Sequence, residues 1–178
     1  KMTMLGKMQS QKYLREMVDA GCDVAIVETT SEGRLQHRHR FINYDIMVLT
    51  NLYPEHIEAH GSFDAYKQAK IDIFSYVASS KRKKRDEKDV PKIGIAATEG
   101  GYADEFLLDT FDEVHRYGPD SDFANSDEQM TEDGLHFCLG TECYDVKMYG
   151  AYNIANISCV ISIARAMDIS WDAIRSSV

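Results

Sequence analysis

The sequence lacks a long hydrophobic run. No stretch of its 178 residues approaches the roughly 20 consecutive apolar residues that a membrane-spanning helix needs. No signal peptide is recognisable either, and because the first residue is Lys1 we expect the natural start to lie upstream. These absences predict a cytoplasmic protein that is not inserted in a membrane.

An excess of positive charge is also missing. The chain has 20 Lys and Arg against 29 Asp and Glu, a formal net charge of −9, so a general nucleic-acid-binding surface is not expected. The one basic run, residues 81–85, is followed directly by Asp86 and Glu87. We therefore interpret segment 79–92 as a solvated linker rather than a nucleic-acid signal.

The four cysteines include no Cys-x-x-Cys pair, so a zinc site of that kind is not indicated. Cys22 and Cys159 lie in apolar contexts, whereas Cys138 and Cys143 flank a hairpin turn expected at 140–142. Because cytoplasmic proteins usually keep their thiols reduced, we expect free cysteines.

The sequence does contain alternating strand and helix patterns, without internal repeats, and is long enough for one domain with a substantial core. The expected elements are strands at about 23–28, 44–49, 92–97 and 113–117, a hairpin at 135–139 and 143–148, and helices at 9–20, 63–78, 102–110, 153–167 and from Trp171, capped by Ser170. The acidic segment 118–132 is expected to be a loop. This order predicts an α/β fold with a mainly parallel sheet flanked by helices and a small antiparallel annex.

Polar residues follow two of these strands. Glu28 closes the apolar run 24–27, and Thr50 with Asn51 closes the run 46–49. In open α/β sheets, ligands bind outside the carboxyl ends of the strands. The two polar clusters therefore predict a ligand site at one edge of the sheet.

The stretch from 27 to 70 resembles the central domain of the Mur ligases, and most closely the UDP-N-acetylmuramoyl-tripeptide synthetases. The matching residues are Glu28, Ser31, Gly33, Gln36-His37-Arg38, Thr50-Asn51-Leu52, His56, His60-Gly61, Tyr66 and Ala69-Lys70, with a second Gly-x-x-Asn-x-x-Asn patch at 150–156. The resemblance implies a three-layer fold like that of P-loop nucleoside triphosphatases, spanning 1–178 and incomplete at its N-terminus. It also implies an ATP-dependent ligase that activates a carboxylate as an acyl phosphate and adds an amino acid to a UDP-N-acetylmuramoyl-peptide in peptidoglycan synthesis.

The resemblance further implies a magnesium (Mg2+) site made by Glu28, His56 and Lys70. In the family this lysine reacts with carbon dioxide and becomes a carbamate. The change replaces a cation, which would repel the metal, by an anion with the oxygen donors that magnesium prefers. Outside this context the three residues would be interpreted as a solvated carboxylate, a turn histidine and an exposed helical lysine.

Substrate and nucleotide contacts are implied in the same way. Thr3, Thr30, Gln36 and Arg38 match positions that hold the UDP-muramoyl-peptide, and the planar fork of Arg38 suits phosphate or carboxylate. Asn153 and Asn156 match residues beside the adenine of ATP, although Asn at a helix start is also a common cap. His60 is expected to shape its loop and to have no chemical role.

Parts of the family pattern are missing. No Gly-x-x-Gly-Lys-Thr phosphate loop occurs in the sequence; in the family it precedes the matched region, and a C-terminal domain that recognises the amino acid follows it. Met4, Glu32 and Glu55 stand where the family usually has Thr, His and Asp. Residues 96–99 stand where the family often has Asn-Ala-Asp-Asp. We therefore expect an interior piece of a longer enzyme that does not turn over ATP alone.

Three other interpretations remain open. One is a ligase like folylpolyglutamate synthetase, against which the cluster 36–38 argues. Another is a non-catalytic interaction protein built on a decayed ligase domain. The third is a magnesium-dependent phosphohydrolase using Glu28 and His56, which would release phosphate from simple esters without a peptide acceptor.

Overall fold

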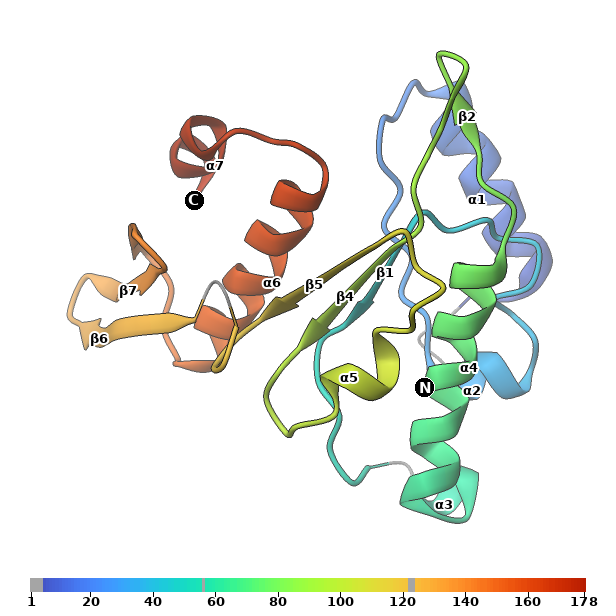
Figure 1. Ribbon diagram of the computed structural model, residues 1–178, viewed down its shortest axis with the longest axis horizontal. Coiled ribbons are helices and arrows are strands. Elements are labelled where there is room, and N and C mark those ends of the chain that lie inside the picture. Colours follow the sequence, from blue (N-terminus) through green and yellow to red (C-terminus); the bar gives the residue numbers. More distant parts are fainter. Residues whose placement is uncertain (1–4, 56, 122–123) are drawn as a thin grey trace.

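The computed structural model describes residues 5–55, 57–121 and 124–178 (Figure 1). Its elements are α1 (Lys7–Asp19), α2 (Ser31–Leu35), β1 (Ile46–Leu49), α3 (Ile57–His60), α4 (Phe63–Ser79), β2 (Lys84–Arg85), β3 (Lys88–Asp89), β4 (Ile93–Ala97), α5 (Ala103–Phe106), β5 (Glu113–Tyr117), β6 (Asn125–Thr131), β7 (Gly134–Leu139), β8 (Glu142–Val146), α6 (Tyr152–Ala166) and α7 (Trp171–Ser177). Among the described helices, none combines the length and apolar composition that crossing a membrane requires.

A parallel sheet of three strands, in the order β1-β4-β5, forms the centre. Successive residues of a strand point to opposite faces of the sheet, so the side chains of β4 contribute to a hydrophobic core on each face. Ile93, Ile95 and Ala97 pack on the α6 side, whereas Ala96 packs on the side of α4 and α5. Helices therefore cover both faces of the sheet, which confirms the three-layer α/β fold (Figure 1).

The helix α4 forms where the apolar spacing predicts it. The Ser62 hydroxyl accepts a hydrogen bond from the Ala65 amide at 3.1 Å and so caps the first turn. The buried side chains of α4 recur at helical spacing: Tyr66, Ala69, Ile73, Phe74, Val77 and Ala78. Four other expected helices and strands are confirmed with small changes of bounds: α1, α6, β1 and β4. Strand β5 and helix α7, capped by Ser170, are confirmed as well.

The expected strand at 23–28 is wrong. Residues 24–30 form no regular secondary structure, and Val24 and Ile26 are 53% and 91% exposed. A strand is stabilised by a ladder partner, and no described strand pairs with this segment. Ile26 and Val27 instead line an open apolar groove together with Tyr13 and Met17 of α1.

One further expectation about local structure is corrected, and another gains detail. The expected helix 102–110 is only the four-residue α5, because the chain turns after it so that Phe111 can pack on the sheet at Gly94. A Cβ at residue 94 would lie 2.9 Å from Phe111 Cδ2, so only glycine permits this approach. The linker 79–92 contains the small β2-β3 hairpin, with Asp86 and Glu87 in its left-handed turn.

The antiparallel annex is a sheet of three strands, β6-β7-β8, and not only the expected hairpin. The acidic segment expected to be a loop contains β6, whose residues are nearly all exposed. Its backbone pairs with β7, for example Asn125 with Leu139 and Met130 with Leu135. This strand is held by main-chain pairing rather than by an apolar face, and hydrophobic periodicity therefore could not reveal it.

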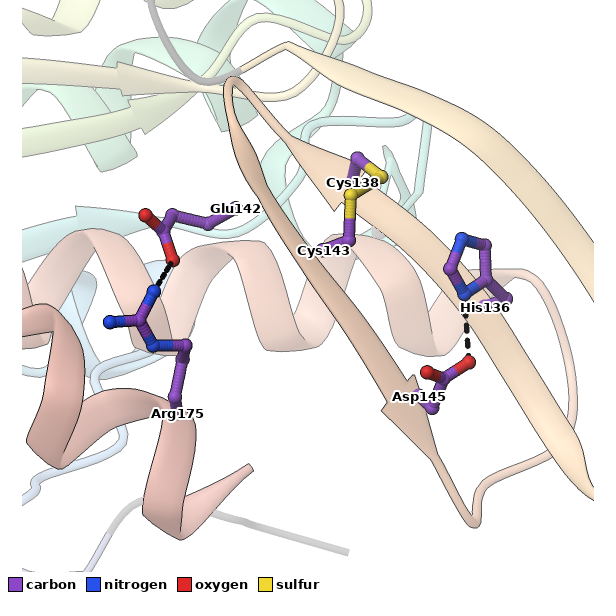
Figure 2. Close-up of a disulfide and its surroundings, with 6 residues drawn as sticks. All are labelled: His136, Cys138, Glu142, Cys143, Asp145 and Arg175. Atoms are coloured by element: carbon purple, nitrogen blue, oxygen red, sulfur yellow. Dashed lines mark hydrogen bonds and ion pairs between the residues drawn. A yellow bond between two sulfur atoms is a disulfide. The ribbon is translucent and has the colours of Figure 1, made fainter.

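The expectation of four free thiols is also wrong. Cys138 and Cys143 form a disulfide across the β7-β8 hairpin (Figure 2), whereas Cys22 is free and exposed and Cys159 is free and buried. The cause is the strand register, which sets Cys138 directly opposite Cys143.

The burial of His39 predicts acid sensitivity. This side chain is 3% exposed and meets Tyr76 edge to face, and its burial, followed by the charge of Arg34, lowers its pKa from 6.5 to about 4. The unfolded chain takes up a proton on His39 near pH 6.5, whereas the folded chain takes it up only near pH 4. The stability of the fold with neutral His39 is therefore complete above pH 6.5 and is lost as pH falls towards 4. We expect the loss to reach about 3 kcal/mol in the free energy of unfolding. Urea unfolding at pH 7 and pH 4.5 measures it, and His39→Phe should reduce the difference; an equal pH dependence in the variant would contradict the assignment.

The hydroxyl of Tyr117 predicts a stabilising tie across the sheet. It donates to the Leu49 carbonyl at 3.1 Å and to the Thr50 carbonyl at 3.3 Å from a side chain that is 1% exposed. Tyr117→Phe leaves the Leu49 and Thr50 carbonyls without this donor and should lower the free energy of unfolding by about 1–2 kcal/mol. Tyr149→Phe is the control, because Tyr149 makes a similar bond to the Glu132 carbonyl in an exposed setting. An equal loss of unfolding free energy in the two variants would mean that the burial of Tyr117 does not determine the size of the loss.

Candidate functional site

The candidate site begins where β1 ends, at the carboxyl edge of the parallel sheet. Residues 50–52 leave the strand there, and Tyr117 at the end of β5 reaches across β4 to hold the carbonyls of Leu49 and Thr50. Leu52, which is 4% exposed, anchors the loop in the core beneath α4. The backbone on either side of Asn51 is therefore held in place, by the Tyr117 hydroxyl before it and by the buried Leu52 side chain after it.

Lys70 of α4 points to this loop. Its Nζ lies 3.4 Å from the Asn51 carbonyl oxygen and 5.1 Å from the centre of the buried Tyr66 ring. Burial lowers the pKa of Lys70, and the negative charge of Glu55 opposes part of that change. A lower pKa increases the neutral fraction of the amine, and only a neutral amine can attack carbon dioxide. The setting of Lys70 therefore suits the predicted carbamate.

Helices α2 and α3 both pack against α4. Thr30 caps α2 by accepting a hydrogen bond from the Gly33 amide at 3.0 Å. The Ser31 hydroxyl, on a residue that is 4% exposed, lies 3.0 Å from His60 Nε2, and the His60 ring lies 5.5 Å from that of Tyr66. His60 therefore joins the start of α2 to α4, which agrees with the expected role in shaping its loop.

An ion pair fixes the same two helices further along. Arg34 of α2 donates to the Asp72 carboxylate of α4 at 2.7 Å, with both side chains partly buried. Asp72 also accepts from Gln68 at 3.0 Å, so its position on the helix surface is set from two sides. The segment that follows Glu28 is thus attached to the helix that carries Lys70.

The predicted metal ligands are only partly described. Glu28 is exposed beside the groove at α1, and His56 lies outside the described residues. Within ranges 5–55, 57–121 and 124–178, no group of three or more His, Cys, Asp and Glu side chains is arranged to hold a metal. The donor chemistry still suits magnesium, since a Glu28 carboxylate and a carbamate on Lys70 would both offer hard oxygen atoms. The ligand set of Glu28, His56 and Lys70 stays a prediction.

The predicted substrate residues cluster around α2, except Thr3, which lies outside the described residues. Thr30 precedes the helix, Gln36 ends it in an exposed position, and the Arg38 amide donates to the Gly33 carbonyl at 2.8 Å. Between the last two, His37 has a left-handed backbone with φ of 55°. This turn places Thr30, Gln36 and Arg38 on one small structural unit, as a shared ligand would need.

The two predicted nucleotide contacts lie in the first turns of α6. Asn153 Nδ2 donates to the Tyr149 carbonyl at 2.8 Å, and Asn153 Oδ1 accepts from Asn156 Nδ2 at 3.2 Å. The N-cap of α6 is Ala151 and makes no side-chain bond, so the capping alternative for Asn153 is wrong. Asn153 is 9% exposed, whereas Asn156 is exposed and available to a ligand.

Sequence reasoning missed two contributors to this site. The charge of Glu55 acts on Lys70, although the sequence showed it only as a substitute for the family's Asp. Tyr117 secures the loop after β1, although its sequence signal is only that of a strand end. Both roles depend on residues far apart in the chain, so no local pattern could reveal them.

Comparison with known proteins shows which family this chain is similar to. Residues 1–164 match the family described as the Mur ligase middle domain. The chain is 27% identical over 177 residues to the UDP-N-acetylmuramoyl-L-alanyl-D-glutamate–2,6-diaminopimelate ligase of Gloeobacter violaceus, covering 96% of this chain and 34% of that protein. It is 30% identical over 162 residues to the ligase of the same name from Chlamydia pneumoniae, covering 88% and 31%. The chain thus spans about a third of the length of these relatives.

Solved structures share the fold. A UDP-N-acetylmuramoyl-L-alanyl-D-glutamate–2,6-diaminopimelate ligase matches 98% of this chain and 36% of its own with a TM-score of 0.81 and 22% identity. The MurF ligase of Thermotoga maritima in complex with ADP matches 82% and 33% with a TM-score of 0.60 and 18% identity. Because the family match extends over most of its 178 residues, this chain belongs to the Mur ligase family and corresponds to its middle domain.

Proposed function

We propose that this chain is the central domain of an ATP-dependent ligase that adds an amino acid to a UDP-N-acetylmuramoyl-peptide through an acyl phosphate. The names of its relatives indicate UDP-N-acetylmuramoyl-L-alanyl-D-glutamate as the acceptor and 2,6-diaminopimelate as the incoming amine. This role belongs to peptidoglycan synthesis in the bacterial cytoplasm. The observation that carries the proposal is the setting of Lys70, half-buried against Tyr66 at the carboxyl edge of the sheet.

The first step concerns Lys70 itself. Its neutral amine attacks carbon dioxide, the Nζ–C bond forms as one C=O π bond opens onto its oxygen, and one of the two protons on Nζ leaves to solvent. The product is an anion, so the repulsion between a lysine cation and a metal ion disappears. Burial, which lowers the pKa of Lys70, favours the neutral amine that this step needs.

The other residues of the site then bind and orient. Glu28, His56 and the carbamate of Lys70 would hold Mg2+, which supplies charge neutralisation at the phosphates when bound. Arg38 and Gln36 would fix the acceptor's anionic groups, since a guanidinium donates two parallel hydrogen bonds. Asn156 would contact the adenine from the exposed start of α6, with its amide held by Asn153 at 3.2 Å. Catalysis of this kind depends mainly on position and charge.

Substitution of Lys70 tests the proposal in the natural full-length protein. Lys70→Ala should lower the rate of acceptor-dependent ADP formation by about a hundredfold or more, because a metal-binding anion is lost. Bicarbonate should stimulate the unmodified protein and leave the variant unchanged. Lys67→Ala is the matched control, since Lys67 lies one turn earlier on α4 and pairs with Glu105 at 2.8 Å. Full activity in Lys70→Ala would overturn the carbamate mechanism.

The metal role of Glu28 predicts a separate effect. Glu28→Gln removes an anionic donor and should raise the Mg2+ concentration for half-maximal activity by about tenfold or more. Glu32→Gln serves as control, because Glu32 lies in the first turn of the neighbouring α2 and is not among the predicted ligands. An unchanged Mg2+ titration in Glu28→Gln would remove Glu28 from the metal site.

A further inference from the structure

The β7-β8 hairpin of the annex carries a disulfide on its outer face. Cys138 and Cys143 are directly opposite each other in the strand register, with their Cα atoms 4.0 Å apart (Figure 2). His136 and Asp145 form the neighbouring pair on the same face, with His136 Nδ1 2.7 Å from Asp145 Oδ1. The alternate residues of the two strands point to the other face, where the annex packs on α6.

Several contacts other than the disulfide hold this hairpin. Phe137, Leu139 and Tyr144 are at most 4% exposed and pack in one cluster with residues of α6 and α7. β8 is also tied to α7 by Arg175, whose Nη1 lies 2.5 Å from a Glu142 carboxylate oxygen (Figure 2). The strand β6 pairs with the other edge of β7. None of these contacts involves the sulfur atoms, so opening the S–S bond removes none of them.

The disulfide also restricts little of the unfolded chain. Its two cysteines are separated by only 5 positions in the sequence, and a short loop loses the least entropy when it is closed. A cross-link that stabilises a fold usually joins segments that are distant in the sequence. This one joins two residues that the hairpin already brings together, so its formation and removal are both compatible with the folded chain.

The two cysteines differ in exposure. Cys143 is exposed, whereas Cys138 is 5% exposed and therefore buried. Thiol–disulfide exchange requires a thiolate to reach one of the two sulfurs of the bond. An external thiol can reach Cys143, and Cys138 is the partner that remains within the protein.

We propose that Cys138 and Cys143 form a reversible thiol–disulfide site that takes dithiol reductants and low-molecular-weight disulfides. In reduction, a thiolate of the dithiol bonds to Cys143 Sγ, the protein S–S bond breaks, and its electron pair leaves on Cys138 Sγ, which takes up a proton. The second thiol of the reductant then displaces Cys143 and closes a cyclic disulfide, so two electrons and two protons pass to the protein. Oxidation is the reverse, with a disulfide compound as acceptor. This inference is independent of the ligase function.

Differential alkylation of the natural full-length protein, without denaturant and with peptide mapping, tests the site. After treatment with oxidised glutathione, Cys138 and Cys143 should be recovered as a linked pair that iodoacetamide does not modify. After dithiothreitol the link should be lost and Cys143 alkylated, with the far-ultraviolet circular dichroism retained. Renewed oxidised glutathione, added before alkylation, should restore the link. Cys22 and Cys159 are internal controls, because both are free thiols and one is exposed whereas the other is buried.

Two variants test the different access of the sulfur atoms. Cys138→Ser should acquire one stable glutathionyl group on Cys143, because the resolving thiol is gone. Cys143→Ser should acquire none on the buried Cys138. A link that dithiothreitol breaks only in denaturant, or thiols that oxidised glutathione does not join, would overturn the proposal in the unmodified protein. Equal adducts in the two folded variants would overturn the assignment of Cys143 as the attacked sulfur.

Discussion

The buried ammonium group of Lys92 is the interaction on which the central sheet depends. This side chain is fully buried at the amino end of β4, and its Nζ donates to Asn43 Oδ1 at 2.8 Å and to the Tyr44 carbonyl. Its backbone amide donates to the Asp112 carboxylate at 2.7 Å, just before β5. One residue therefore holds the segments that enter β1 and β5 against the start of β4. A buried charge is costly unless it is paired and hydrogen-bonded, so these partners must stay in place.

The opposite edge of the sheet is held by a different kind of contact and carries the candidate site. Tyr117 fixes the carbonyls where β1 ends, and the His60–Ser31 contact joins the start of α2 to the α3–α4 region. Between these ties, Lys70 lies over Tyr66 and against the Asn51 carbonyl. The rigid parts therefore surround a lysine whose Nζ has a long contact, 3.4 Å, to the Asn51 carbonyl oxygen. A loosely held amine of this kind is compatible with the proposed modification and metal binding.

Helix α6 joins the parallel sheet to the annex. Cys159, Ile163 and Ala166 pack on β4 and β5, whereas Ile154 and Ile161 pack on the strands of the annex. The first turn of the same helix carries Asn153, whose amide holds the Tyr149 carbonyl. The disulfide lies on the far side of the annex from α6, where a change in its bonding leaves this shared core intact. Chemistry at the surface of the annex is thus separated from the packing that orients α6.

The sequence by itself determined the elements that bury an apolar face, such as α4, β4 and the β7-β8 hairpin, because their periodicity is local. The motif spacing from Glu28 to Lys70 also indicated the family. Of the two polar clusters expected at strand ends, Thr50 with Asn51 does follow a strand, whereas Glu28 follows none. Only the tertiary structure decided that segment 24–30 has no described ladder partner and that exposed β6 is a strand. It alone also paired Cys138 with Cys143 and set Glu55 near Lys70. These features depend on contacts between segments that are distant in the sequence. Such contacts produce no periodic pattern of apolar residues, so the sequence alone could not reveal them.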